Sequence, residues 1–293
     1  MRDDVLGEVR SAIPRLSAAE RRVAERILED PERVVDLTIT GLAELCSSSQ
    51  ATIARFCQSV GFSGYREFRL ALAAATSREQ AARDRFDLTT GDIDFADSVE
   101  NIASKIAYQE TLAIEQTTKG LDFAALSRAA TAIRGAARVD LYGVGASSLT
   151  AQDLQQKLTR VGLAAFFSAD PHLALTSAAL LGPGDVAVVV SHTGETLETL
   201  NVILAARQAG AVTVAITNYP ASELAEAADC VLVTHARESR YRSGAMSSRI
   251  AQLTVGDVLF VSVVQGMPER MAGALERTYV AVKRGTRGRR LDA

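Results

Sequence analysis

Between residues 139 and 233, five short apolar runs alternate with helical patterns, and this alternation restricts the fold more than any other feature of the chain. Apolar strands that are separated by helices form parallel sheets buried on both faces. The pattern therefore predicts an α/β sandwich, a doubly wound parallel sheet covered by helices on both sides. A final helix is expected over residues 247–264. The predicted strands cover residues 139–142, 164–167, 186–190, 212–216 and 230–233.

The first 77 residues show helical spacing instead, and their turns are short. Ser17 precedes Glu20 by three residues, which is the signature of a capping box and predicts a helix over residues 17–29. Farther on, an apolar helical segment precedes the turn-prone triplet 47–49, and a second helical pattern follows. This order predicts two short helices joined by a tight turn, a helix-turn-helix. The second pattern consists of Ile53, Phe56, Cys57 and Val60.

These patterns divide the chain into four segments and give an α + α/β fold class. Helical spacing breaks down after residue 77, where polar residues and a Thr-Thr-Gly-Asp run indicate a linker. The basic C-terminal tail is expected to be disordered, a solvated terminus rather than an arm that binds DNA. The expected segments are a helix-turn-helix domain (1–77), the linker (78–94), the α/β domain with flanking helices (95–280) and the tail (281–293).

The composition is that of a folded globular protein, with 293 residues, 47% hydrophobic and 23% charged. Its net charge of -3 indicates no general preference for nucleic acid, so DNA binding must depend on a local surface. The three cysteines show no metal-ligand spacing and leave one thiol over in any pairing, which favours a reducing, cytoplasmic location. We expect no membrane span, because no apolar run reaches the ~18 residues that a membrane helix needs. No metal and no cofactor is predicted.

The second helix of the predicted helix-turn-helix has a face suited to a DNA major groove. Its apolar residues are expected to pack inward, which turns small and polar residues outward near its N-terminus. Three of the four charged residues from 50 to 69 are arginines, so this face is locally positive. Arg55 is expected to donate to a guanine or a phosphate. The same spacing also fits a helical bundle used for dimerisation. The predicted DNA-binding residues are Ser49, Gln50, Thr52, Arg55, Tyr65 and Arg66.

The segment 191–196, SHTGET, lies between a predicted strand and a predicted helix. Such a loop presents unpaired backbone N–H groups and the positive end of the helix dipole to an anion. Ser191, Thr193 and Thr196 add neutral hydroxyl donors, and Gly194 lets a ligand approach the backbone. The loop therefore favours reversible binding of a phosphate monoester. A capped helix start without a ligand explains the same residues.

A second loop of this kind, residues 143–148, follows the first predicted strand. It matches the dinucleotide-binding fingerprint weakly, because Ser148 occupies the third glycine position, and a nucleotide-binding sensor is therefore kept as an alternative. The first and third strands of a doubly wound sheet can be neighbours, so both loops can converge on one small phosphorylated ligand. The predicted ligand-binding residues are Gly145, Ser147, Ser148, Ser191, His192, Thr193, Gly194 and Thr196.

Two stretches of the chain resemble known families. Residues 1–77 resemble the N-terminal helix-turn-helix of RpiR-type transcriptional regulators, notably in ATIARFC at 51–57 and GFSGY at 61–65. Residues 122–267 resemble the sugar isomerase (SIS) domain. Together the two resemblances cover most of the chain.

The resemblance implies roles for the residues of both loops. Ser147 would contact the sugar or its phosphate, and His192 would line the pocket without a catalytic role. The segment 242–249 is similar to the stretch that enters the last SIS helix in these regulators, and it would bring Glu238 or Arg242 near the ligand or a partner subunit. The residues implied to hold the phosphate are Ser191, Thr193 and Thr196.

SIS enzymes that interconvert aldose and ketose phosphates need a base that moves a proton between neighbouring carbons. The three histidines of this chain match no such motif, and Glu195 is better explained as an acid in the first turn of a helix. We therefore predict no catalytic residue, and a regulator whose partners are operator DNA, a phosphorylated sugar effector and further copies of itself in a homodimer or homotetramer. The alternative is a phosphosugar isomerase or lyase with an N-terminal helical oligomerisation domain.

Overall fold

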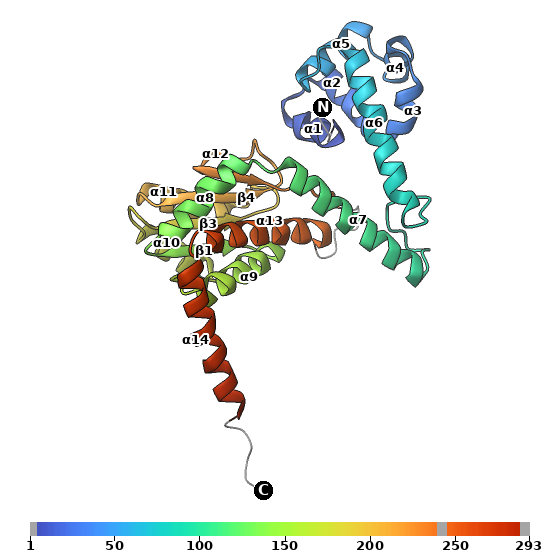
Figure 1. The fold of residues 1–293 in the computed structure, drawn as a ribbon. Helices are drawn as coiled ribbons and strands as arrows, with labels where there is room; N and C mark the ends of the chain where they lie inside the picture. Colours follow the sequence, from blue (N-terminus) through green and yellow to red (C-terminus); the bar gives the residue numbers. More distant parts are fainter. Residues whose placement is uncertain (1–4, 239–244, 288–293) are drawn as a thin grey trace. The chain divides into compact units, whose positions relative to one another are not determined.

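The computed structural model describes residues 5–238 and 245–287 (Figure 1). The chain divides into two compact units between Tyr108 and Gln109. This division falls inside the long helix α7 (Val99–Gly120), downstream of the region 78–94 where the sequence suggested a linker. The first unit is helical and the second contains a parallel sheet, which confirms the predicted fold class.

Capped helix starts determine where the elements of the first unit begin. At Ser17 the predicted capping box is present: its hydroxyl accepts the N–H of Glu20, and the Glu20 carboxylate accepts the N–H of Ser17 at 3.0 Å. Asp30, Thr38 and Ser49 cap the following helices with their side chains. The helices up to this point are α1 (Val5–Ala12), the 3-10 turn η1 (Ile13–Arg15), α2 (Ala18–Glu29), α3 (Pro31–Asp36), α4 (Ile39–Leu45) and α5 (Gln50–Ser59).

Aromatic rings form the centre of the first unit. The ring of Phe68 lies edge-on to those of Phe56 and Phe62, with centroids 5.6 and 5.4 Å apart. Ile53, Phe56 and Cys57 of α5 are fully buried, as their spacing predicted. Packing of α5 against α2, α4 and α6 gives the helix-turn-helix a rigid core.

Helix α6 (Tyr65–Asp84) extends past the position where the sequence placed the start of the linker. Residues 65–84 contain neither glycine nor proline and include many alanines, so helical propensity carries the helix beyond residue 77. Irregular turns then lead to α7. There a nearly buried ion pair joins Lys105 to Asp97 at 2.7 Å.

The second unit is built on a five-stranded parallel sheet in the order β2-β1-β3-β4-β5. All five predicted strands are present. Every residue of β3 is buried, which explains its continuous run of valine and alanine. The strands are β1 (Val139–Gly143), β2 (Ala165–Phe167), β3 (Val186–Val190), β4 (Val212–Thr217) and β5 (Cys230–Val233).

Helices cover both faces of this sheet (Figure 1). One face packs on α8 (Phe123–Gly135), α9 (Ala146–Arg160) and α13 (Met246–Gln265). The other packs on α10 (Pro171–Ala179), α11 (Leu197–Gln208) and α12 (Glu223–Glu226). Because β1 and β3 are neighbours whose following helices lie on opposite faces, a crevice opens between their carboxyl ends, where doubly wound folds bind ligands.

Helix α13 is long and apolar enough to cross a membrane by length and composition. In this fold it is a core helix: Ala251, Val255 and Leu259 are fully buried, and the helix packs on α8 and α9. Its position matches the predicted final helix.

A further helix, α14 (Pro268–Arg287), follows α13 and corrects the prediction for the C-terminus. The sequence placed a disordered tail at 281–293, yet the helix continues through residue 287. Pro268 is favourable in the first turn of a helix and starts α14, and the residues after it favour helix strongly enough to continue through Gly285. Residues 288–293 lie outside the described part of the chain.

Candidate functional site

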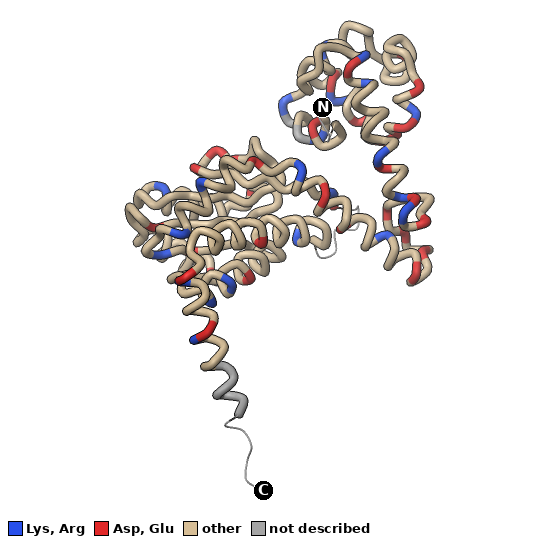
Figure 2. Tube along the Cα trace, viewed as in Figure 1, with Lys and Arg blue, Asp and Glu red and all other residues tan. Residues whose placement is uncertain are grey.

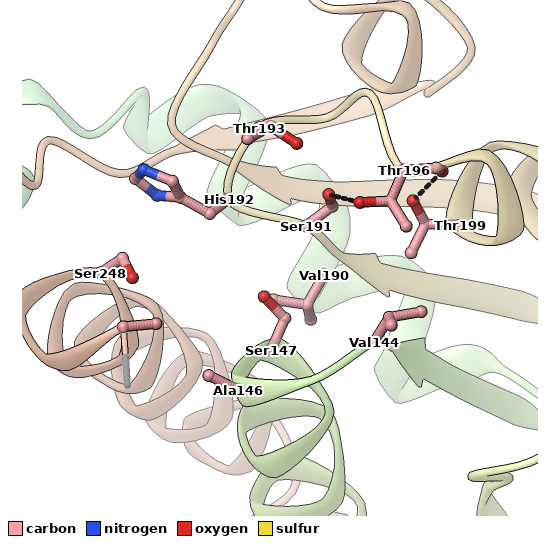
Figure 3. A pocket seen from close by; sticks show the side chains of 11 residues that line it. Val144, Ala146, Ser147, Val190, Ser191, His192, Thr193, Thr196, Thr199 and Ser248 are labelled. Atoms are coloured by element: carbon pink, nitrogen blue, oxygen red, sulfur yellow. Dashed lines mark hydrogen bonds between the residues drawn. The ribbon is translucent and has the colours of Figure 1, made fainter. Parts of the chain in front are cut away.

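A pocket of about 120 Å³ opens at the crevice between β1 and β3 (Figure 3). The loop after β1, the loop after β3 and the first turn of α13 form its walls. The N-termini of α9, α11 and α13 therefore converge on it, and each contributes the positive end of a helix dipole. None of the described lining residues is a lysine or an arginine. The lining residues are Val144, Ala146, Ser147, Val190, Ser191, His192, Thr193, Thr196, Thr199, Ala245 and Ser248.

Tight packing shapes the loop after β1. A side chain at Gly143 would come within 2.8 Å of the Ser147 carbonyl oxygen, and Gly145 has a φ of 59°, which favours glycine. Ser147 is 8% exposed, and its Oγ accepts a hydrogen bond of 3.1 Å from Nε2 of Gln252 on α13. Since the oxygen is the acceptor there, the hydroxyl hydrogen of Ser147 can turn toward a ligand.

The SHTGET loop is held by its own hydroxyls. Ser191 Oγ accepts the N–H of Gly194 at 3.2 Å and donates to Thr196 Oγ1 at 3.5 Å. Gly194 has a φ of 67°, and a side chain there would collide with Ser222. The hydroxyls of Ser147, Ser191 and Thr196 lie around one central space (Figure 3).

Five of the eight predicted ligand-binding residues line the pocket: Ser147, Ser191, His192, Thr193 and Thr196. Gly145, Ser148 and Gly194 are absent from the lining and shape the loops instead. Ser148, for example, donates its hydroxyl to the Gly145 carbonyl at 2.6 Å, which closes the first turn of α9. The structure thus separates the residues that face the pocket from those that support it.

Two hydroxyl residues of the lining were missed by the sequence reasoning. Thr199 is buried one turn into α11 and donates to the Thr196 carbonyl at 2.6 Å. Its hydroxyl three residues after Thr196 was a local signal. Ser248 is buried at the start of α13, about a hundred residues downstream of the first loop, so only the tertiary fold brings it to the site.

The stretch before α13 contributes a carboxylate near the pocket. Glu238 accepts the backbone N–H of Ser248 at 2.7 Å and so caps the first turn of α13. Glu238 therefore contacts a residue that lines the pocket. Arg242, the other residue that the resemblance would bring near the ligand or a partner subunit, lies outside the described residues.

His192 and Glu195, the titratable residues of the SHTGET loop, occupy different environments. The His192 ring is half-buried, lines the pocket and lies edge-on to Tyr219 with centroids 5.8 Å apart. Its backbone carbonyl accepts the N–H of Asn218 at 3.0 Å, which ties the loop to the end of β4. Glu195 is exposed and outside the lining.

In the first unit, α5 presents part of the predicted DNA-binding set to solvent. Gln50, Arg55 and Arg66 are exposed, and Gln50 Nε2 donates to Thr40 Oγ1 at 3.0 Å. Ser49 is exposed and forms the N-cap, with its hydroxyl accepting the N–H of Thr52 at 3.2 Å. Figure 2 shows acidic and basic residues interspersed over this unit, in keeping with its lack of a general charge bias.

Two residues of that set are less accessible than expected. Thr52 was predicted to face outward but is 6% exposed, because it sits at the margin of the apolar stripe; its Oγ1 accepts from Arg55 Nη2 at 3.2 Å. Tyr65 is half-buried, and its hydroxyl donates to the Leu37 carbonyl at 2.9 Å. Burial raises the pKa of Tyr65. Arg69 donates to the same carbonyl at 3.3 Å, so both residues brace α6 against the end of α3.

Comparisons with known proteins agree with both units. The model of the helix-turn-helix domain of the rpiR family matches residues 4–79, and that of the SIS domain matches residues 132–262. An uncharacterized HTH-type transcriptional regulator of Caldanaerobacter subterraneus subsp. tengcongensis is 38% identical over 275 residues, covering 94% of this chain and 95% of the relative. A counterpart in Haemophilus influenzae is 34% identical over 277 residues, with 94% and 95% covered.

Solved structures extend the likeness to the whole chain. The Vibrio vulnificus NanR protein, complexed with ManNAc-6P, is 31% identical, with a TM-score of 0.60 over 95% of this chain and 97% of that one. The sugar isomerase domain of an RpiR transcription factor from Sphaerobacter thermophilus shares the fold of the second unit, with a TM-score of 0.56, 24% identity, and 60% of this chain and 97% of that chain covered. The chain belongs to the RpiR family of helix-turn-helix transcriptional regulators that carry a SIS domain.

Proposed function

We propose that this regulator senses a phosphorylated sugar in the pocket between β1 and β3. The observation that carries the proposal is the convergence of three helix N-termini on a pocket lined by neutral hydroxyls. Ser191, Thr193 and Thr196 hold the phosphate at the N-terminus of α11, and Ser147 and Ser248 bind the phosphate or the sugar from the opposite wall. The complex of V. vulnificus NanR with ManNAc-6P supports this ligand class.

The pocket serves binding rather than turnover. Proton transfer between sugar carbons needs a base within hydrogen-bond reach of the substrate. Among the described lining residues, only His192 has a titratable side chain, and it matches no catalytic motif in the sequence. Glu195 faces solvent. The relatives from C. subterraneus and H. influenzae, which match nearly the whole chain, are named as transcriptional regulators. If ³¹P NMR shows a sugar phosphate converted to its isomer by the purified chain, this part of the proposal is wrong.

The effector is tested by thermal shift on the full chain. N-Acetylmannosamine 6-phosphate, glucosamine 6-phosphate, other sugar phosphates and the matching free sugars are added in turn, because a ligand that binds only the folded state raises the Tm. One phosphorylated sugar is expected to raise the Tm while its unphosphorylated form does not. Equal shifts from both forms would show that the pocket does not recognise phosphate.

The first unit, we propose, binds operator DNA in the cytoplasm through α5. Ser49, Gln50 and Arg55 lie exposed around the start and outer face of that helix, and Arg66 is exposed at the start of α6. Thr52 supports Arg55 through its hydrogen bond rather than by touching DNA. Two recognition helices about one DNA turn apart read a palindromic site, so a homodimer or homotetramer is the form we propose to act.

Replacing Arg55 tests the DNA surface. Arg55→Ala should weaken binding to the specific operator by about 1–3 kcal/mol, the worth of a good base contact, and leave effector affinity unchanged. The change is measured by fluorescence anisotropy at one salt concentration. Gln80→Ala, an exposed polar change far along α6, is the matched control. Operator affinity equal to that of the wild type in Arg55→Ala would remove Arg55 from the interface.

A further inference from the structure

A second pocket lies in the SIS domain on the sheet face that carries α10, and the proposed effector site does not use it. Its volume is about 430 Å³, which falls within the roughly 300–1,000 Å³ of small-molecule sites. Strands β1 and β2 form its floor and α10 its main wall. Figure 1 labels β1 and α10, and β2 is the short edge strand beside β1. The lining residues that matter below are Arg138, Asp140, Tyr142, Phe166, Leu173 and Ser177.

The pocket exists because α10 covers this end of the sheet incompletely. Strand β2 has three residues and lies at the sheet edge, so nothing in the described part of the chain pairs with its outer side. The Phe166 side chain is 52% exposed on β2, and Leu173 on α10 is 64% exposed. The lining is therefore mostly apolar, as in small-molecule sites generally.

One buried polar group of the lining has no hydrogen-bond partner. Tyr142 is 3% exposed, and its hydroxyl lies buried without a donor or acceptor in reach. Buried tyrosine hydroxyls nearly always find a partner, because an unpaired one loses its hydration without compensation. Burial, and after it the carboxylates of Glu198 and Asp170, raise the pKa of Tyr142. The phenol therefore stays protonated at neutral pH and offers a hydrogen-bond donor.

The charged groups of the lining neutralise each other. Arg138 donates to both carboxylate oxygens of Asp140, at 2.6 and 3.0 Å, and Ser177 hydrogen bonds to both residues. The guanidinium also lies over the Phe166 ring, 4.8 Å from its centroid. Arg138 and Asp140 are the charged residues among those described in this lining, so the pocket offers no net charge to a ligand.

We propose that this second pocket binds a small neutral molecule with an apolar or aromatic body and one hydrogen-bond acceptor that meets the Tyr142 hydroxyl. The apolar lining receives the body, the acceptor satisfies the buried phenol, and the internal ion pair disfavours anions and cations alike. The site is distinct from the pocket lined by the SHTGET loop, and its ligand class excludes sugar phosphates. The proposal does not depend on the effector proposed above.

Three probes of one shape test the chemistry on the full chain by ligand-observed NMR. Acetophenone carries an acceptor, ethylbenzene has none, and benzoate is an anion. Acetophenone is expected to bind most tightly. Tyr142→Phe removes the hydroxyl at nearly constant volume. It should weaken the binding of acetophenone by roughly 2- to 12-fold, the range of one neutral hydrogen bond, and leave the binding of ethylbenzene unchanged. Equal loss of both probes, tighter binding of benzoate, or no binding of acetophenone would overturn the proposal.

A pair of variants on α10 tests the location. Leu173, 64% exposed, lines the pocket, whereas Leu175, 38% exposed on the same helix, does not, and neither belongs to the buried core. Leu173→Arg should abolish acetophenone binding, whereas Leu175→Arg should retain it. Acetophenone that binds Leu173→Arg as it binds the wild type would place the site elsewhere. Binding that disappears as protein concentration rises and a larger oligomer forms would assign the surface to a subunit contact and also overturn the proposal.

Discussion

Ser191 both shapes its loop and faces the pocket. Its oxygen accepts the buried N–H of Gly194, while the same hydroxyl lines the pocket beside Thr193 and Thr196. The Thr193 hydroxyl contributes less to the structure of the loop, because it accepts only an exposed hydrogen bond of 3.3 Å from the N–H of Glu195. A change at Ser191 is therefore expected to affect stability as well as ligand binding, and a change at Thr193 chiefly ligand binding.

Replacing these two hydroxyls should abolish the effector response. The Ser191→Ala, Thr193→Ala variant loses two neutral donors to the phosphate, and loss of the Gly194 hydrogen bond costs it about 1–3 kcal/mol of folding free energy. The Tm without ligand shows that the variant is folded, and the thermal shift with sugar phosphate reads the response. Ser148→Ala, outside the lining, serves as the control and should respond normally. A full ligand shift in the double variant would move the phosphate site away from this loop.

Helices α9 and α13 meet through a buried chain of three polar side chains. Thr150 donates to Gln252 Oε1 at 3.4 Å, and Gln252 donates in turn to Ser147, which lines the pocket. Thr150 and Gln252 are 1% exposed. Because buried polar groups are costly unless paired, this chain fixes both the Ser147 hydroxyl and the spacing of the two helices.

Removing Gln252, the middle member of these three hydrogen-bonded side chains, should affect folding stability and effector affinity separately. Gln252→Leu leaves two buried hydroxyls without their amide partner, which should lower the unfolding free energy by about 1–3 kcal/mol and effector affinity by about 3- to 10-fold. Adding Thr150→Val removes one of the unpaired hydroxyls and should restore part of the stability without restoring affinity. Denaturant unfolding and ligand titration measure the two quantities. Affinity that recovers together with stability would show that Gln252 does not position Ser147.

The capping box of α2 gives the first unit a pH-dependent contribution. The hydrogen bond from the Ser17 hydroxyl lowers the pKa of Glu20 from its ordinary 4.5, because it favours the carboxylate. A lowered native pKa stabilises the fold above the unfolded-state pKa, and this contribution disappears as the pH falls through the native value. Ser17→Ala should therefore lower the Tm more at pH 7 than at pH 3. A difference in Tm that is the same at both pH values would contradict the capping role of Glu20.

Local patterns predicted the elements better than the site. Strands β3, β4 and β5 were found because their valine-rich runs leave few alternatives. Helices α2 and α5 were found because capping residues precede apolar spacing. Thr52 was misplaced because it lies at the margin of the apolar stripe on α5, where periodicity does not decide between core and surface. Ser248, which lines the pocket, and Gln252, which supports Ser147, were missed because both act from α13 through tertiary contacts that no local pattern encodes.

In the whole regulator, effector and operator must influence each other equally. A ligand shifts a conformational equilibrium only through its different affinity for the two states, and the coupling between two bound ligands is reciprocal. If the sugar phosphate changes operator affinity tenfold, saturating operator DNA should change sugar-phosphate affinity tenfold in the same direction. Calorimetric titration of the full chain with and without operator DNA measures this factor. Unequal factors would indicate that effector and DNA bind different oligomers.

The absence of lysine and arginine among the described lining residues of the effector pocket has a consequence for ionic strength. Dipoles and hydroxyls at close range inside a pocket are screened little by dissolved ions. Arginine contacts to DNA phosphates, in contrast, weaken steeply as the salt concentration rises, because binding releases counterions from the DNA. A higher potassium chloride concentration should therefore lower the affinity for operator DNA, while the affinity for the sugar phosphate stays nearly constant. If the pocket binds a sugar phosphate as proposed, osmotic stress that raises the salt concentration in a cell would change operator occupancy without changing effector occupancy.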